Sequence, residues 1–158
     1  MKKYINILRE DEKAKVNEMQ KQFATQYGFE LAIEDIALSM STYDKVNQAG
    51  FINELPALFG DLYLETALYK VLIEDYNITV KGKLNKLGQN YLSRETQSKY
   101  MLDSGLADQI LVGNSTNLYV TKNSPKTLHS IFENIIYMVH EHYGIEGVKN
   151  FIRKANYL

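Results

Sequence analysis

The spacing of apolar residues constrains the fold of this chain more than any other feature of the sequence. Long windows repeat apolar positions every three or four residues, which is the period of helices, whereas strands repeat them every two. Only two prolines, Pro56 and Pro125, interrupt the 158 residues. The pattern predicts an all-α fold, with helices over these segments: 10–27, 30–43, 55–76, 84–92, 94–104, 126–143 and 145–156.

The composition is that of a globular protein, with 45% hydrophobic and 23% charged residues. A chain of 158 residues has the length of one ordinary domain, so we expect a single domain over 1–158. The absence of cysteine excludes disulfides, thiolate zinc sites and cysteine nucleophiles, and it suits a reducing compartment. No apolar run reaches the length of a membrane span. We therefore expect a cytoplasmic protein with no membrane partner.

The charge balance excludes a strong global attraction for nucleic acid. Eighteen basic and nineteen acidic residues leave a formal charge of -1, so any phosphate contact must come from a local patch. The best candidate is the lysine cluster Lys81, Lys83 and Lys86, although short lysine runs are often only solvated turns. The sequence contains no glycine-rich phosphate loop, nucleophile elbow or GxGxxG motif, which argues against nucleotide hydrolysis, α/β-hydrolase chemistry and dinucleotide binding.

The segment 55–76 has the clearest helix signals in the chain. Asn53 is a suitable cap, and Pro56 falls in the first turn, where its missing N–H costs little. Gly60 lies inside this helix, where glycine costs about 1 kcal/mol relative to alanine. It predicts either a close helix crossing or a tolerated weak position. By contrast, residues 113–124 are rich in Asn, Ser and Thr, so we expect the longest loop there.

Acidic side chains gather on one side of each of two predicted helices, because residues on a helix advance by about 100° each. The segment 55–76 and its cap place three carboxylates on one side: Glu54, Asp61 and Glu65. The segment 126–143 likewise places three side chains together: His129, Glu133 and His140. If the two sides meet, their oxygens are suited to Mg²⁺ and to phosphodiester chemistry. The alternative is that both are solvated helix faces with surface ion pairs.

Five short motifs in order resemble the catalytic domain of the ribonuclease III family. Residues 53–61 (NELPALFGD) are similar to the family signature NERLEFLGD. Four further stretches resemble the LTHxSY, LTKLR, GLGDYLLLG and LADAFEALI motifs: residues 38–43 (LSMSTY), 84–87 (LNKL), 105–113 (GLADQILVG) and 128–136 (LHSIFENII). The resemblance covers about residues 16–155 at the spacing found in the family.

This resemblance implies an all-α, dimeric nuclease domain that cuts double-stranded RNA with Mg²⁺. It assigns catalytic positions to Glu54, Asp61 and Glu133, and we expect Glu65 to join Asp61 and Glu133 as a metal ligand. Two family acids are replaced, by Ala57 and Ser130. Loss of two anionic oxygens weakens a divalent site, so we expect weak or lost cleavage.

Two further expectations follow from the comparison with the family motifs. The acidic turn of the family reads Lys81-Gly82-Lys83, a reversal of charge. The sequence ends at Leu158, so we expect no double-stranded-RNA-binding domain and low RNA affinity without a partner. The central helix should pack against that of a second copy, because Leu58, Phe59 and Leu62 make its surface more apolar than a monomer needs.

Three hypotheses remain at the level of sequence. We favour a degenerate ribonuclease III-like domain that binds structured or double-stranded RNA, as a homodimer, without efficient cleavage. The second hypothesis is a working Mg²⁺-dependent endoribonuclease, since Mg²⁺ keeps several waters and three acids can suffice. The third is a protein-interaction module with no role in RNA. The sequence leaves the RNA target and the identity of the dimer partner open.

Overall fold

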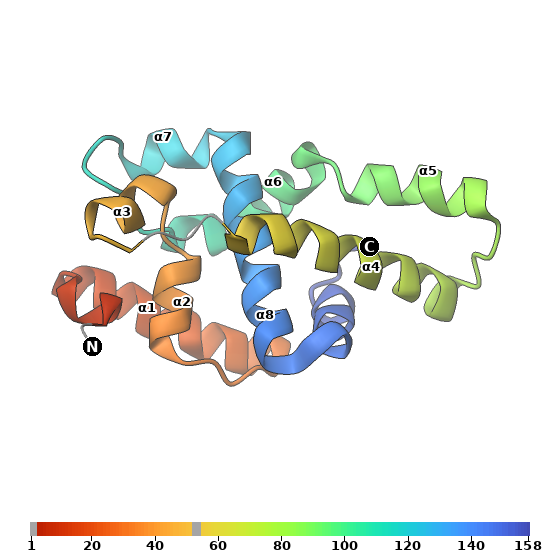
Figure 1. The fold of residues 1–158 in the computed structure, drawn as a ribbon, viewed down its shortest axis with the longest axis horizontal. Helices are drawn as coiled ribbons and strands as arrows, with labels where there is room; N and C mark the ends of the chain where they lie inside the picture. Colours follow the sequence, from red (N-terminus) through yellow and green to blue (C-terminus); the bar gives the residue numbers. More distant parts are fainter. Residues whose placement is uncertain (1–2, 52–54) are drawn as a thin grey trace.

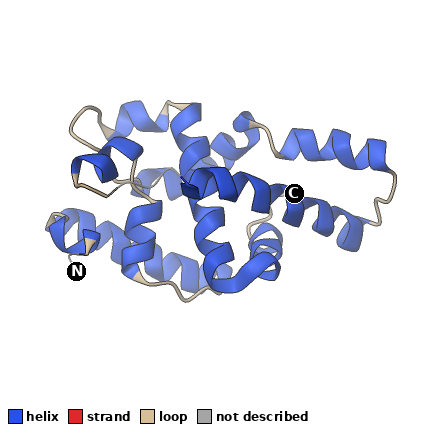
Figure 2. Cartoon of the chain, viewed as in Figure 1, coloured by secondary structure: helices blue, strands red, loops and turns tan. Residues whose placement is uncertain are grey.

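The computed structural model describes residues 3–51 and 55–158, and its regular structure is helical (Figure 1, Figure 2). Over these residues no strand forms, and one isolated parallel bridge joins Ser41 to Leu111. The prediction of an all-α fold is confirmed. The helical elements in chain order are η1 (Tyr4–Ile7), α1 (Glu10–Gln22), η2 (Phe23–Tyr27), α2 (Ile33–Ser39), α3 (Tyr43–Gln48), α4 (Leu55–Tyr76), α5 (Lys81–Tyr91), α6 (Arg94–Asp103), η3 (Leu106–Gln109), α7 (Leu118–Lys122) and α8 (Pro125–Lys154).

Helices α4 and α8 cross near the middle of the molecule and form its main packing contact (Figure 1). Gly60 lies at the crossing, where a Cβ atom would be 1.9 Å from the backbone oxygen of Glu133. Only glycine leaves room for so close an approach. The structure therefore explains Gly60 by a close crossing, and it confirms the predicted packing of segment 55–76 beside segment 126–143.

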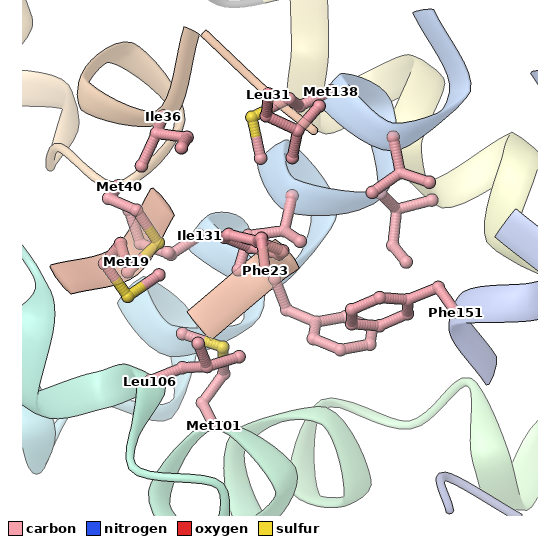
Figure 3. Close-up of a cluster of buried hydrophobic side chains, with 14 of the residues drawn as sticks. Met19, Phe23, Leu31, Ile36, Met40, Met101, Leu106, Ile131, Met138 and Phe151 are labelled. Atoms are coloured by element: carbon pink, nitrogen blue, oxygen red, sulfur yellow. The ribbon is translucent and has the colours of Figure 1, made fainter. Parts of the chain in front are cut away.

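One part of the hydrophobic core lies between the N-terminal helices, α6 and α8 (Figure 3). Phe23 of η2, Met101 of α6 and Phe151 of α8 are all completely buried there. Each side chain of this size contributes about 1.5–3 kcal/mol by leaving water. This core holds α8 in place, and α8 in turn carries half of the candidate site described below.

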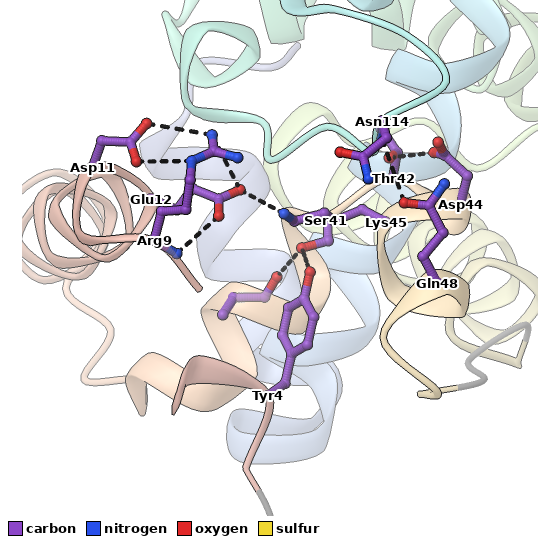
Figure 4. Close-up of polar contacts among 11 residues, drawn as sticks. Tyr4, Arg9, Asp11, Glu12, Ser41, Thr42, Asp44, Lys45, Gln48 and Asn114 are labelled. Carbon is purple, nitrogen blue, oxygen red and sulfur yellow. Dashed lines mark hydrogen bonds and ion pairs between the residues drawn. The ribbon is translucent and has the colours of Figure 1, made fainter. Parts of the chain in front are cut away.

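Polar contacts attach the N-terminal segment to the α2–α3 region (Figure 4). The hydroxyl groups of Tyr4 and Ser41 are 2.7 Å apart in the interior. The buried carboxylate of Glu12 lies 2.8 Å from the ammonium group of Lys45 on α3. A buried charge is stable only when it is paired, so Lys45 fixes α1 against α3.

The chain reverses within α8 and returns to α4. Gly144 has a φ of 67°, which interrupts the helical backbone at the position where the sequence predicts a break. After this kink, the ammonium group of Lys149 lies 2.8 Å from Glu74, and Arg153 lies 2.7 Å from Asp75. These ion pairs join the end of α8 to the last turns of α4.

Two predictions of local structure are wrong. The segment 30–43 is not one helix, because the backbone after α2 forms hydrogen bonds with residue Leu111: the Leu111 N–H donates to the Met40 oxygen and the Thr42 N–H to the Leu111 oxygen. A separate short helix, α3, follows. The loop predicted over 113–124 contains α7, because the Asn117 side chain accepts a hydrogen bond from the Val120 N–H and starts a helix.

Among the helices that the structure describes, none has both the length and the apolar character needed to cross a bilayer.

Candidate carboxylate site and adjoining hollow

Asp61 of α4 and Glu133 of α8 meet beside the helix crossing. Their carboxyl groups lie within hydrogen-bonding range of each other. Gly60 precedes Asp61 and packs against the backbone of Glu133, so the close backbone contact sets the contact between the two side chains. The fold thus brings together two carboxyl groups that lie 72 residues apart in sequence. That they bind a metal or take part in catalysis stays a prediction.

The environment of Glu133 favours its neutral form. The residue is 6% exposed. Burial, followed by the charge and the hydrogen bond of Asp61, raises the pKa of Glu133 to about 8, whereas the charge of Arg94 opposes this shift. At pH 7 Glu133 is therefore mostly protonated, and it donates a hydrogen bond to the Asp61 carboxylate.

His129 extends this pair by one residue. Its Nε2 atom lies 3.2 Å from a carboxyl oxygen of Glu133. Burial lowers the pKa of His129, Arg94 lowers it further, and Asp61 acts in the opposite direction. A neutral imidazole donates from Nε2 to Glu133, while its buried Nδ1 atom has no hydrogen-bond partner in the described part of the chain. The contact is thus a hydrogen bond between neutral groups at pH 7, not a surface ion pair.

Ala57 and Ser130 lie one turn before Asp61 and Glu133 on the same two helices, and both line a hollow of about 680 Å³. Most of the residues that line the hollow belong to α2, α3, α7 and the first turns of α4 and α8. Its lining includes apolar side chains, several hydroxyl groups, the carboxylate of Asp44 and the exposed Lys126. The two positions at which the resembling motifs have acids thus carry small neutral side chains here, and both side chains line the same hollow.

The remaining predicted site residues are not gathered at this pair. Glu65 is partly exposed on α4, and no group of three or more His, Asp or Glu side chains among the described residues is arranged to hold a metal ion. Glu54 lies outside the described residues. His140 stacks on the ring of Tyr63, with centroids 3.5 Å apart, instead of joining Glu133.

The donor set at the carboxyl pair fits Mg²⁺ only weakly. One or two carboxylates can hold this ion when waters and substrate phosphate complete its shell. Asp61 and Glu133 are the residues that would supply them, but Glu133 must first lose a proton that its surroundings stabilise. An ion bound there would stabilise the charge on a phosphodiester.

The lysine cluster lies at a distance from this site, on the exposed side of α5. Figure 1 shows α4 and α5 running side by side and extending away from the other helices. Lys81, Lys83 and Lys86 are all exposed, and none forms an ion pair with a residue that the structure describes. Their charges are therefore free to meet phosphate groups.

An apolar stripe follows the exposed side of α4. Leu58 is 59% exposed and Leu62 is 50% exposed. Leu55 and Phe59 on the same helix, and Ile73 and Tyr76 further along it, are exposed as well. Large exposed apolar side chains gathered on one element are typical of an interaction surface.

Sequence reasoning missed two charged residues of this region. Arg94 acts on both Glu133 and His129, but no spacing rule connects the start of α6 to α8, since the contact depends on the tertiary fold. The position of Lys126 could have been predicted from the sequence, because Lys126 lies four residues before Ser130 and hence on the same side of a helix.

Comparison with known proteins agrees with the resemblance seen in the motifs. No family model matches the sequence. The chain is 23% identical over 144 residues to ribonuclease 3 of Lactobacillus acidophilus, a match that covers 90% of this chain and 63% of that protein. The chain thus spans less than two thirds of the length of this curated relative.

Two solved structures of the nuclease domain of ribonuclease III from Campylobacter jejuni have a similar fold. One, described for structural flexibility in a region involved in its dimer formation, gives a TM-score of 0.71 at 20% identity and covers 90% of this chain and 94% of its own. The other gives a TM-score of 0.72 at 19% identity, covering 86% and 92%.

Proposed function

Because this chain has the all-α fold of a ribonuclease III nuclease domain, we propose that it binds structured or double-stranded RNA and cleaves it weakly or not at all. The observation that carries the proposal is the hollow at Ala57 and Ser130. Where the family motif has two acids, this chain has two neutral side chains, which line a hollow together with Asp44 and Lys126. A phosphate group meets less repulsion there, while a divalent ion loses two of its oxygen ligands.

The carboxyl pair supports binding without efficient cleavage. A protonated Glu133 offers Mg²⁺ no anionic oxygen, and burial keeps that proton in place near neutral pH. Asp61 is then the remaining described carboxylate at this pair. One carboxylate with a guanidinium group nearby holds a divalent cation poorly.

The lysines of α5 are the proposed contacts to the RNA backbone. Each lysine that neutralises a phosphate releases counterions, so affinity falls with salt in proportion to the number of contacts. Changing Lys81, Lys83 and Lys86 together to alanine should weaken binding and reduce the salt slope by about one for each lysine. The matched control changes Lys13, Lys15 and Lys21 on α1, which lies away from α5 (Figure 1).

We also propose that two copies associate through the apolar stripe of α4. Leu58→Asp combined with Leu62→Asp should convert a dimer at micromolar concentration into a monomer, because both substitutions place charge on this surface. Leu102→Asp is the control, since Leu102 is an exposed apolar residue of α6. Sedimentation velocity distinguishes the outcomes, and a monomeric wild-type protein would exclude this part of the proposal.

A filter-binding and cleavage assay tests the function itself. A long RNA duplex is incubated with the protein, with and without Mg²⁺ or Mn²⁺, and retention and product length are measured. Retention in both conditions with no products supports the proposal. Absence of retention contradicts it and favours a protein-interaction module.

The contact between Asp61 and Glu133 favours one alternative, an active Mg²⁺-dependent double-stranded-RNA endoribonuclease. These two positions keep the acids of the family motif and lie together in space. If this alternative is correct, the unmodified protein cuts the duplex and Asp61→Asn abolishes cutting. Comparing the thermal unfolding of Asp61→Asn with that of the unmodified protein separates a loss of activity from a loss of fold.

The remaining parts of the proposal concern the number of domains and the cellular compartment. We propose that residues 1–158 form one domain and that it acts in the cytoplasm. The absence of cysteine suits that reducing compartment.

A further inference from the structure

The hollow at Ala57 and Ser130 has the chemistry of a ligand site that the carboxyl pair does not use. We infer that it takes one unpaired nucleobase of a bound RNA, with the adjoining phosphate against Lys126. This inference rests on the proposed RNA binding and adds the class of RNA that is preferred. At about 680 Å³ the hollow is within the range of small-ligand sites and exceeds the volume of one base.

The lining of the hollow contains both kinds of group that a base contacts, apolar side chains and hydrogen-bonding groups. Leu38, Val46 and Ile131 provide apolar contact for a planar ring. Thr116 and Asn134 also line the space and carry groups that can hydrogen-bond to a base edge. The apolar and polar groups together favour a heterocycle over a purely apolar ligand.

The charged groups of the hollow favour a nucleotide over a cation. Asp44 lines the space, but its two oxygens accept hydrogen bonds from Thr42 and Ser115 at 2.6 and 2.5 Å. Lys126 is exposed, and it forms no ion pair with any described residue. A phosphate group is the complementary partner for this lysine.

Side-chain size explains why the base must be unpaired. Ala57 and Ser130 are smaller than the glutamate and aspartate of the family motif, and the space they leave belongs to the hollow. A base that remains stacked and paired presents only its edge in a groove, whereas a base from a bulge or loop can leave the stack and enter a pocket.

The test compares three RNA duplexes by filter binding: one fully paired, one with a single unpaired nucleotide in the middle, and one with an abasic nucleotide at that position. The unpaired base should bind about tenfold more tightly than either of the other two, which is the scale of one base contact. The abasic duplex separates the base from the flexibility of the interrupted backbone.

Two variants locate the effect. Ala57→Leu should remove the preference for the unpaired base, because the larger side chain fills part of the hollow that Ala57 lines. Ala14→Leu on the exposed side of α1 is the matched control. Lys126→Ala should reduce the preference by removing the phosphate contact. Because Lys126 is exposed, this substitution should leave the fold unchanged.

The outcomes distinguish the two proposals. Equal binding of all three duplexes overturns the inference and leaves RNA binding intact. A preference for the unpaired base that survives both Ala57→Leu and Lys126→Ala also overturns the inference, because the base then binds elsewhere. Failure to bind any duplex overturns both proposals.

Discussion

Asp61 and Glu133 lie on one turn of the α4–α8 crossing, and Ala57 and Ser130 lie on the preceding turn of the same two helices. The later turn is tightly packed: Gly60 contacts the backbone of Glu133, and the side chain of Glu133 is hydrogen-bonded to that of Asp61. The earlier turn opens into a hollow of about 680 Å³. Neighbouring turns of one crossing thus provide a buried acid pair and an open hollow without those acids.

The difference shows that one helix crossing can hold a densely packed turn and, next to it, a turn that is open to a ligand. Where the backbones touch, small changes in side-chain size or charge must be absorbed by a dense interior. Where the side chains are small and the helices diverge, the same changes alter only what the space can bind. Substitutions at the two turns test this contrast, from the largest expected effect to the smallest.

Gly60→Val should have the largest effect, because its side chain would occupy the position of the Glu133 backbone oxygen. We expect the free energy of unfolding to fall by about 3 kcal/mol or more, measured by denaturant titration. The matched control is Gly82→Ala on α5, where an added Cβ meets nothing within 4 Å. That variant should gain up to about 1 kcal/mol. Equal stability of the two variants would contradict the close crossing.

Glu133→Gln should change how stability depends on pH. The folded-state pKa of Glu133 is raised to about 8, so its contribution to stability is present at low pH and is lost as pH rises through that value. Glutamine does not titrate. Relative to the unmodified protein, the variant should therefore gain on the order of 2 kcal/mol between about pH 5 and pH 9. Ser130→Ala should keep the unmodified pH dependence, and an identical slope for Glu133→Gln would show that the pair is not protonated.

Placing acids at positions 57 and 130 should increase the affinity of this turn for a divalent metal ion. Ala57→Glu combined with Ser130→Asp adds two anionic oxygens beside the retained pair, and Mg²⁺ or Mn²⁺ affinity should rise about tenfold or more. Isothermal titration calorimetry measures this. The control, Ala57→Gln combined with Ser130→Asn, has similar shape without charge. A similar gain in the control would mean that charge is not the missing element.

The same contrast shows what the sequence could predict. Helical periodicity was sufficient for α4, whose predicted range 55–76 agrees with the structure, and Gly60 already indicated a close crossing. The break after α2 was not predictable, because it depends on hydrogen bonds with Leu111, a residue far along the chain.

The site was predictable only in part for the same reason. The positions of Asp61 and Glu133 on their helix faces follow from the spacing of residues in the sequence. The motif resemblance adds the expectation that these two helix faces lie together. The protonation of Glu133 depends on burial and on Arg94, which belongs to a third helix. The hollow at Ala57 is a space left between five helices, and no periodic pattern encodes such a space.

Ser130→Ala should have the smallest effect on stability. The hydroxyl group donates to the Lys126 carbonyl one turn earlier, at 3.1 Å, and this carbonyl belongs to the first turns of α8. Removing a hydrogen bond of this kind costs little in a helix, and alanine has the higher helix propensity, so the two terms nearly cancel. We expect a change within about 0.5 kcal/mol in denaturant titration. A loss similar to that of Gly60→Val would mean that the turn at Ser130 is as tightly packed as the turn at Glu133, and the contrast between the two turns would fail.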